Sequence, residues 1–219
     1  MAIKILIVDD HPLFRGALRL AAEGAVDRAE IREAADFDAA VAAIVAEPGL
    51  DLVLLDLNLP GAHGFSGLLL LRAQYPALPV VMVSGSAAPT TVSLAMQFGA
   101  AGFVPKTSSI EDMRAAFRQV LAGGSWTPPN AAIDIGANAD TAELAAKMAR
   151  LTPQQLRVLT MLSDGLLNKQ IAYALDVSEA TVKAHVSAIL QKLDVDSRTQ
   201  AVIAASRIMV PGRAAAGGI

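Results

Sequence analysis

The sequence predicts an α/β domain with a five-stranded parallel sheet, followed by a smaller all-helical domain. In the first 122 residues, five short aliphatic runs alternate with five helical stretches, which is typical of a doubly wound parallel sheet with right-handed crossovers. From residue 152 onward, apolar residues recur at helical spacing and no strand pattern is present. We therefore expect an α/β domain at 1–122, a linker with a short helix at 123–150, a helical domain at 151–210 and a flexible tail at 211–219.

The predicted strands are short runs of aliphatic residues, as expected for strands that are buried on both faces. The second run is interrupted by Arg32 and Glu33, which a strand at the edge of the sheet tolerates. The strands are expected at 3–8, 29–34, 52–55, 79–83 and 102–105, and the helices between them at 13–23, 37–46, 64–74, 90–98 and 109–121.

The second half of the chain begins with a change in composition. Glycine, proline, alanine and asparagine dominate from Gly123 to about Asp140, which is typical of a linker, and a short helix is expected at 141–150. Thr152 and Pro153 then provide an N-cap and a proline at the first helical position. That helix ends at Gly165, and three more are expected at 168–175, 179–193 and 198–209.

Composition and charge exclude several classes of protein. With 53% hydrophobic and 18% charged residues, the chain is globular rather than disordered. No apolar stretch suits a membrane span, the N-terminus does not resemble a signal peptide and there is no cysteine, so we expect a cytoplasmic protein. Residues 1–150 carry 11 basic and 16 acidic residues (−5), whereas residues 151–219 carry 7 and 5 (+2), which indicates different partners for the two parts.

Charged residues stand where three of the predicted strands end. Asp9 and Asp10 follow the first aliphatic run, Asp56 follows the third and Lys106 follows the fifth, while Ser84 ends the fourth. The carboxyl ends of parallel strands lie at one edge of the sheet, where ligands bind in such folds, so these side chains are expected to meet there. Three neighbouring carboxylates repel one another unless they are neutralised, and their oxygens are ligands that suit Mg²⁺.

We expect Asp56 to be more than a metal ligand. A carboxylate can act as a nucleophile toward phosphorus and form an aspartyl phosphate. The ammonium group of Lys106 and the hydroxyl of Ser84 are suited to bind the phosphoryl oxygens. His11 adjoins the acidic pair, and we interpret it as a loop residue that packs beside Pro12 rather than as a metal ligand.

Together these motifs resemble the receiver domain of bacterial two-component systems. The resemblance implies a flavodoxin-like fold with strand order 2-1-3-4-5 and phosphorylation of Asp56 by a sensor histidine kinase. It also implies that Mg²⁺ binds at Asp10, Asp56 and the backbone carbonyl of Asn58, with Asp9 assisting. The resemblance covers about residues 2–122 and is carried by Val8-Asp9-Asp10-His11-Pro12, Leu55-Asp56-Leu57-Asn58-Leu59-Pro60-Gly61, Ser84 and Phe103-Val104-Pro105-Lys106.

The same resemblance implies how the phosphorylated state is detected. Ser84 is expected to move toward the phosphoryl group while the aromatic residue Phe103 changes rotamer. Phe103 stands where tyrosine is commoner in the family, so an output contact through a hydroxyl is not available. The peptide bond between Val104 and Pro105 is expected to be cis.

In the helical domain, the helices at 168–175 and 179–193 have the spacing of a helix-turn-helix, whose second helix enters the major groove of DNA. Lys183 can donate to guanine or phosphate, Ser187 can reach either kind of group and Ala184 can contact a thymine methyl. The residues expected to contact phosphate are Thr181, Lys169, His185 and Lys192.

This region looks like the LuxR-type four-helix DNA-binding domain, with a match that runs without gaps from Leu151 to Arg198. Asp176 stands where glycine is common, and aspartate tolerates the left-handed backbone of a tight turn. In the last helix, an apolar stripe that includes Ala201 and Ala205 suits either core packing or a two-fold dimer contact. The predicted core residues are Ile171, Ala172, Leu175, Val177, Val182, Val186 and Leu190.

Over nearly its whole length the chain resembles a response regulator of the NarL/FixJ family. We therefore expect a non-enzymatic protein in which phosphorylation of Asp56 controls sequence-specific binding to double-stranded DNA, with a homodimer as the active form and no membrane partner. Two alternatives stay open. The output could be a protein–protein interaction with weak or phosphorylation-independent DNA binding. The second alternative is an aspartyl-phosphate phosphatase of another fold, but Asn58 stands where such enzymes need a second aspartate.

Overall fold

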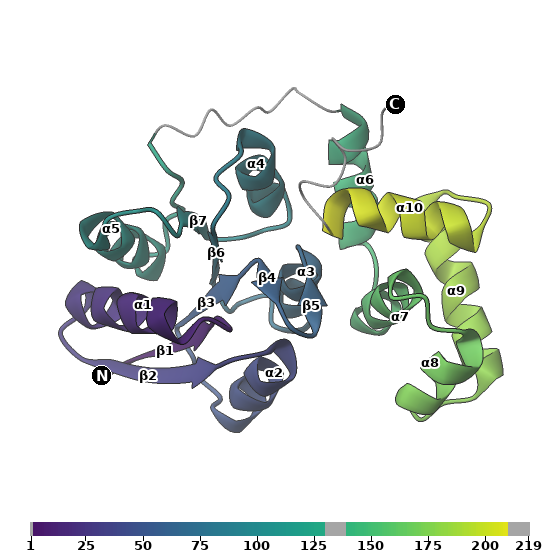
Figure 1. The fold of residues 1–219 in the computed structure, drawn as a ribbon, viewed down its shortest axis with the longest axis horizontal. Helices are drawn as coiled ribbons and strands as arrows, with labels where there is room; N and C mark the ends of the chain where they lie inside the picture. The colour runs from purple at the N-terminus through teal and green to yellow at the C-terminus, as the bar shows by residue number, and fades with distance from the viewer. Residues whose placement is uncertain (1, 130–138, 210–219) are drawn as a thin grey trace.

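The centre of the first domain is a parallel sheet of five strands. In the computed structural model, which describes residues 2–129 and 139–209, the strands lie in the order β2-β1-β3-β6-β7 (Figure 1). This is the predicted order, because these are the second, first, third, fourth and fifth strands of the sheet along the chain. The strands are β1 (Ile3–Val8), β2 (Ala29–Ala34), β3 (Leu52–Asp56), β6 (Val80–Ser84) and β7 (Gly102–Pro105).

The strand boundaries place Asp56 inside the sheet. β3 includes Asp56 as its last residue, and Asp56 pairs with Val83 of β6. After Asp56 the chain forms a two-stranded antiparallel hairpin, β4 (Asn58–Leu59) and β5 (Ala62–His63), whose turn includes Gly61 at a φ of 82°. Glycine adopts this left-handed backbone without strain, so the connection after Asp56 can reverse within two residues.

Helices cover both faces of the sheet. α1 (Pro12–Ala25) and α5 (Ile110–Leu121) pack together on one face, where Leu18 and Phe117 are fully buried against β-strand side chains. α2 (Phe37–Ala46), α3 (Ser66–Gln74) and α4 (Pro89–Gln97) lie on the other face (Figure 1).

The expected cis bond before Pro105 is wrong, since the described residues contain no cis peptide bond. Pro105 continues β7 in extended geometry and pairs with Ser84 of β6. The next residue, Lys106, donates its backbone N–H to the Ser84 carbonyl at 2.7 Å. A trans bond keeps the strand straight through the proline, which holds the backbone of Lys106 in line with the ladder.

The segment after α5 remains attached to the sheet for a few residues. The backbone of Trp126 bridges to Gly102, and Phe103 donates its N–H to the Trp126 carbonyl at 3.0 Å. A side chain at position 102 would lie about 3.2 Å from that carbonyl, so glycine allows the close approach. Residues 130–138 of the predicted linker and the predicted tail at 211–219 lie outside the described residues.

Five helices follow, and their order is the predicted one. The turn before the fourth of them uses Asp176 at a φ of 52°, as the sequence suggested, and Gly165 takes a φ of 83° after the second. In the last helix Ala201 and Ala205 are fully buried, which decides for core packing. The helices are α6 (Ala139–Ala149), α7 (Pro153–Ser163), α8 (Asn168–Ala174), α9 (Glu179–Leu193) and α10 (Arg198–Met209).

The helical domain packs on the outer surface of the α/β domain. α7 lies on α3, and α6 lies on α4 (Figure 1). A helix that covers a sheet normally buries one stripe, but six consecutive residues of α3, 66–71, and five of α4, 91–95, are buried. The two helices are therefore covered on both sides, and apolar side chains of the two domains form one continuous cluster. None of the described helices is long and apolar enough to cross a membrane.

We predict that Leu70→Gln loosens the contact between the domains. Leu70 is 6% exposed on α3, the helix that α7 contacts, and it lies about 200° around that helix from the fully buried Leu68. A buried glutamine without partners costs about 1–3 kcal/mol, so the docked arrangement should weaken and the radius of gyration in X-ray scattering should increase. Leu20→Gln on the exposed side of α1 is the matched control. A folded Leu70→Gln protein with an unchanged radius of gyration would contradict the prediction.

Candidate functional sites

The carboxyl edge of the sheet gathers the charged residues that the sequence placed at strand ends. Asp9 and Asp10 follow β1, Asp56 ends β3 and Lys106 follows β7. Lys106 Nζ lies 2.6 Å from Asp9 Oδ2 and 2.9 Å from Asp56 Oδ2, so one ammonium group joins two carboxylates from different strands. The same Nζ lies 4.8 Å from the centre of the Phe14 ring on α1, where the ring face attracts a cation.

Burial affects the ionisation of both Asp56 and Lys106. Asp9 is fully buried and Asp56 is 4% exposed. Burial raises the pKa of the Asp56 carboxyl above its ordinary value, and the hydrogen bond and charge of Lys106 offset this only in part. Burial also acts to lower the pKa of Lys106, but its hydrogen bonds to Asp9 and Asp56 outweigh that effect and raise it. The ammonium group of Lys106 therefore stays charged, while the ionised form of Asp56 lowers the stability of the folded protein.

The two oxygens of Asp56 have different environments. Oδ2 accepts a hydrogen bond from Lys106, whereas the buried Oδ1 has no partner in hydrogen-bonding geometry. The backbone N–H of Asn58 also acts to lower the pKa of this carboxyl, with a smaller effect than Lys106. Asp56 lies on the wall of a cavity of about 520 Å³, which is lined by His11, Leu13, Phe14, Asp56, Asn58, Gly85 and Lys106. A buried carboxylate oxygen without a partner is costly, so it is a position at which a ligand would be stabilising.

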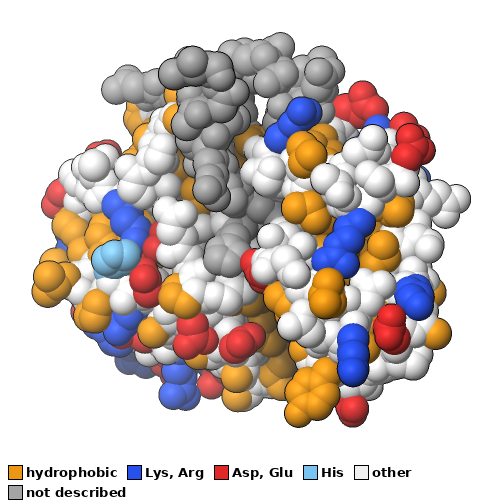
Figure 2. All heavy atoms as spheres, turned by 45° about the vertical axis from the view of Figure 1, so that its right-hand side comes forward, with side chains coloured by type: hydrophobic (Ala, Val, Ile, Leu, Met, Phe, Trp, Pro, Cys, Tyr) orange, Lys and Arg blue, Asp and Glu red, His pale blue; other side chains and the backbone are white. Residues whose placement is uncertain are grey.

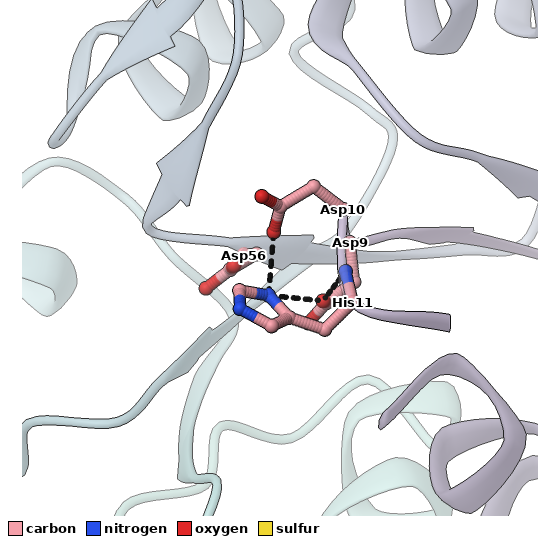
Figure 3. A group of neighbouring side chains, drawn as sticks. All are labelled: Asp9, Asp10, His11 and Asp56. Atoms are coloured by element: carbon pink, nitrogen blue, oxygen red, sulfur yellow. Dashed lines mark hydrogen bonds and ion pairs between the residues drawn. The ribbon is translucent and has the colours of Figure 1, made fainter. Parts of the chain in front are cut away.

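The donor atoms at this edge fit a small cation. One ligand atom each from Asp9, Asp10, His11 and Asp56 can be chosen so that all four lie within 4.8 Å of one another (Figure 3). Carboxylate oxygens in this number are what Mg²⁺ prefers, together with water. Asn58, the further ligand that the family resemblance implies, is exposed on β4, two residues after Asp56.

Ser84 ends β6 at this edge, and Phe103 lies further back in β7, three residues before Lys106. Ser84 is fully buried, and its Oγ accepts a hydrogen bond from the Ser86 N–H at 3.1 Å. Phe103 is also fully buried and pairs with Met82 in the sheet. In this conformation the serine hydroxyl is thus engaged in the loop after β6, and the aromatic ring lies in the core.

Sequence reasoning missed two neighbours of the acidic residues. Phe14 supports Lys106, and its only signal was its position one helical turn after the acidic pair. His11 is the N-cap residue of α1, and its Nδ1 lies 2.6 Å from Asp10 Oδ1 and 3.4 Å from Asp9 Oδ1. The loop position of His11 was expected, but the ring contact with Asp10 was not.

In the helical domain, α8 and α9 form the predicted helix-turn-helix. Ser178 caps α9 by accepting the N–H of Thr181 at 3.0 Å. Thr181, Lys183, Ala184 and Ser187 are exposed on α9 and His185 is half-buried, while Lys169 is exposed on α8. The predicted core residues 171, 172 and 182 are buried and the other four are partly buried around them; Ile189 and Leu193, which the prediction omitted, complete that core.

Lys192 differs from the other predicted phosphate contacts. Its Nζ donates to the Arg150 carbonyl at 2.9 Å and to Gln155 Oε1 at 2.8 Å. The same Gln155 oxygen accepts the Thr152 N–H in the capping box of α7. The ammonium group of Lys192 thus joins the end of α9 to the start of α7 inside the domain.

On the face of the molecule that Figure 2 shows, the basic side chains are not concentrated in one patch. In Figure 2, the blue side chains on the right-hand part of the molecule are spaced among red and orange ones. Moreover, Lys183 Nζ lies 3.5 Å from Oε1 of Glu179, one helical turn earlier, so its charge is partly neutralised. Charge alone therefore gives this face a weak attraction for a polyanion, and specific contacts would have to contribute the rest.

Comparisons with known proteins agree with both halves of this description. The family model of the response regulator receiver domain matches residues 5–118, and that of the luxR family of bacterial regulatory proteins matches residues 149–205. The chain therefore belongs to the response regulators that combine a receiver domain with a LuxR-type DNA-binding domain. More narrowly, it is a NarL-type response regulator.

Two relatives illustrate this membership. The chain is 43% identical over 211 residues to the glycerol metabolism activator of Pseudomonas putida, covering 94% of this chain and 96% of the relative. It is 34% identical over 203 residues to the nitrate/nitrite response regulator protein NarL of Escherichia coli strain K12, covering 91% and 93%.

Solved structures share the fold. RcsB of Salmonella enterica serovar Typhimurium, bound to the promoter P1flhDC in the presence of the phosphomimetic BeF3-, aligns with a TM-score of 0.56 at 21% identity. The alignment covers 94% of this chain and 98% of RcsB.

We predict that Asp56→Asn stabilises the protein at neutral pH in the absence of divalent cations. Because the pKa of Asp56 is raised on folding, the ionised carboxyl costs stability once the pH exceeds its ordinary pKa and approaches the raised value. Asparagine keeps the acceptor for Lys106 without the charge, so the free energy of unfolding should rise by about 1 kcal/mol in urea titrations at pH 7.

This gain should vanish as the pH falls below the ordinary pKa of aspartate, since Asp56 is then protonated in both states. The exposed Asp27→Asn is the control substitution. A gain that is independent of pH, or a loss at pH 7, would show that burial does not dominate the ionisation of Asp56.

Proposed function

We propose that Asp56 accepts a phosphoryl group from the phosphohistidine of a sensor kinase and thereby controls binding of the helical domain to double-stranded DNA. The observation that carries this proposal is the asymmetry of the Asp56 carboxylate. One oxygen is held by Lys106, and the other is buried without a hydrogen-bond partner in a residue that lines an open cavity. The nucleophilic residue is therefore oriented by Lys106 and lies at the wall of the cavity.

The chemistry of the transfer requires little from the protein besides position and charge. An Asp56 oxygen forms the new bond to phosphorus as the bond between phosphorus and the kinase imidazole breaks, and the electron pair of that bond returns to the imidazole. Lys106 Nζ is 2.9 Å from the carboxylate, so it can bind an oxygen of the transferred group without moving far. Ser84 Oγ would have to exchange its contact with Ser86 to donate a second hydrogen bond.

We propose Mg²⁺ as the cofactor, held by Asp10, Asp56 and the backbone of Asn58, with Asp9 assisting. When bound, it supplies positive charge for the carboxylates and for the phosphoryl oxygens. The fit rests on the cluster of donor atoms and on the partner-free oxygen of Asp56.

The packing of the two domains suggests how the modification reaches the DNA-binding half. Ser84 ends β6, and α4 follows five residues later with its outer side covered by α6. A change at Ser84 can therefore displace α4 and weaken the contacts with α6 and α7. The exposed residues of α9 face solvent in the docked form, so docking does not cover them. We propose instead that docking fixes the domain in an orientation that hinders two copies from pairing on DNA half-sites.

We further propose that Lys183, Ala184 and Ser187 contact bases and that Thr181, Lys169 and His185 contact phosphates. For Lys192 the geometry favours a structural role, because its ammonium group is bound inside the domain. The chain would act as a transcription regulator rather than as an enzyme, and in the cytoplasm, where both the kinase catalytic domain and the DNA are present. The alternative, in which the output is a protein–protein interaction, is favoured only by the sparse basic side chains on the face shown in Figure 2.

Incubation with acetyl phosphate and Mg²⁺ should add one phosphoryl group at Asp56, detected by intact-protein mass spectrometry. Asp56→Asn should abolish the addition, and Lys106→Ala should reduce it because the phosphoryl oxygens lose their positive partner. Labelling that persists in Asp56→Asn would exclude this residue as the acceptor.

If Lys183 contacts a base, Lys183→Ala should weaken binding of the phosphorylated protein to its DNA site by about 1–3 kcal/mol. If Lys183 contacts a phosphate, the slope of the logarithm of the binding constant against the logarithm of the salt concentration should fall by about one. Lys192→Ala should leave the salt dependence unchanged, since its ammonium group is bound within the domain. Gel-shift titrations over a series of salt concentrations measure both effects. Absence of any specific site, with no effect of Lys183→Ala, would instead support the protein–protein output.

A further inference from the structure

We propose that His11 supplies an imidazole nitrogen to the cation site at Asp9, Asp10 and Asp56, so that this site binds first-row transition metals with a nitrogen ligand. The inference rests on the proposed cation site and goes beyond it, because it changes the donor set from oxygen alone to oxygen and nitrogen. The site would then distinguish Mg²⁺ from ions such as Mn²⁺ and Ni²⁺.

The backbone around His11 brings its ring to the acidic edge. The His11 N–H donates to Asp9 Oδ1 at 2.8 Å. The His11 carbonyl accepts hydrogen bonds from the backbone N–H groups of Phe14 and Arg15 in the first turn of α1. The residue is thus fixed at both ends, between β1 and α1. In Figure 3 the Nδ1 side of the imidazole lies toward Asp10 and Asp9, and Asp56, at the end of the neighbouring strand β3, lies nearby.

The spacing of the donors is that of ligands around one ion. Metal–ligand distances of about 2.1 Å place neighbouring ligands of an octahedral ion about 3 Å apart and opposite ligands about 4.2 Å apart. His11 Nδ1 lies 2.6 Å from Asp10 Oδ1 and 3.4 Å from Asp9 Oδ1, and the four donors lie within 4.8 Å of one another. To form a regular shell, the His11–Asp10 pair would have to open by about 0.4 Å and the most distant donors would have to approach by up to about 0.6 Å.

The contact between His11 and Asp10 is not an ordinary hydrogen bond. Although the two atoms are only 2.6 Å apart, Asp10 Oδ1 has no hydrogen-bond partner. Two cis ligands of one metal have this relation, because the nitrogen lone pair points at the ion and not at the neighbouring oxygen. The buried Oδ1 of Asp56 also has no hydrogen-bond partner, and such an oxygen is a second, independent indication of a ligand site.

The chemistry of imidazole decides which ions this arrangement favours. Mg²⁺ prefers oxygen and gains little from a nitrogen ligand, whereas affinity for an imidazole rises from Mn²⁺ toward Ni²⁺ and Cu²⁺. The His11 ring is mostly exposed, with 67% of its side chain accessible, so it can turn toward the ion or away from it. Mg²⁺ would therefore bind with the ring displaced, and a transition metal with the ring coordinated.

Calorimetric titration of wild-type protein and His11→Gln with Mg²⁺ and Ni²⁺ tests this ordering. We expect His11→Gln to weaken Ni²⁺ binding by about tenfold or more and to change Mg²⁺ binding by less than about twofold. His63→Gln on β5 is the matched control and should bind both ions as wild type does. Equal effects of His11→Gln on both ions, or no effect on either, would overturn the proposal.

Pulsed electron paramagnetic resonance of the Mn²⁺-bound protein gives a direct readout of the ligand. Wild-type protein should show the hyperfine coupling of a directly bound imidazole nitrogen, and His11→Gln should lack it. A coupling that persists in His11→Gln but is lost in His63→Gln would assign the nitrogen elsewhere and refute the inference. Labelling of Asp56 by acetyl phosphate and Mg²⁺ in His11→Gln separates the two proposals, because it depends on the oxygen ligands alone. Absence of Mg²⁺ binding in wild type would refute both.

Discussion

The ion pairs of Lys106 with Asp9 and Asp56 are the interaction on which the functional edge of this molecule depends. Three carboxylates from two strands lie side by side in a largely buried position, and each would repel the others without a cation among them. In the described structure one ammonium group provides that charge, and it is held by the sheet at one side and by the Phe14 ring at the other. Because a single charge cannot neutralise three, the edge retains an oxygen without a partner and thus a preference for a ligand.

This incomplete neutralisation is also what makes the edge able to switch. A fully satisfied cluster would have no reason to bind a cation or a phosphoryl group, whereas this one gains from both. The response would extend beyond the pocket because Ser84, at the same edge, connects through the backbone to α4. α4 and α3 are the two helices of the sheet that carry the second domain, and their outer sides are apolar and covered. Small movements at the edge therefore act on a buried interface, where packing allows few intermediate positions.

Much of the fold and of the acidic site could be predicted from the sequence, for identifiable reasons. Strands buried on both faces are continuous aliphatic runs, so 3–8 and 102–105 were predicted with their observed limits. The limits of 29–34 were also predicted, although this edge strand is interrupted by Arg32 and Glu33 and is largely exposed. The convergence of Asp9, Asp56 and Lys106 followed from the rule that parallel strands end at one edge. The cis bond before Pro105 was predicted wrongly, because the family expectation did not take account of how β7 continues through the proline to pair with β6.

By itself, the sequence determined the order of the elements, the set of charges at the sheet edge and the presence of a helix-turn-helix, since each depends on local periodicity or on residues at strand and helix ends. Only the tertiary structure decided which atoms of those charges meet: that Lys106 joins two carboxylates, that His11 contacts Asp10 and that Lys192 is bound inside its own domain. The tertiary structure also decided that α6 and α7 cover α4 and α3. These contacts join residues far apart along the chain or depend on the direction of a side chain, and neither is encoded in local pattern.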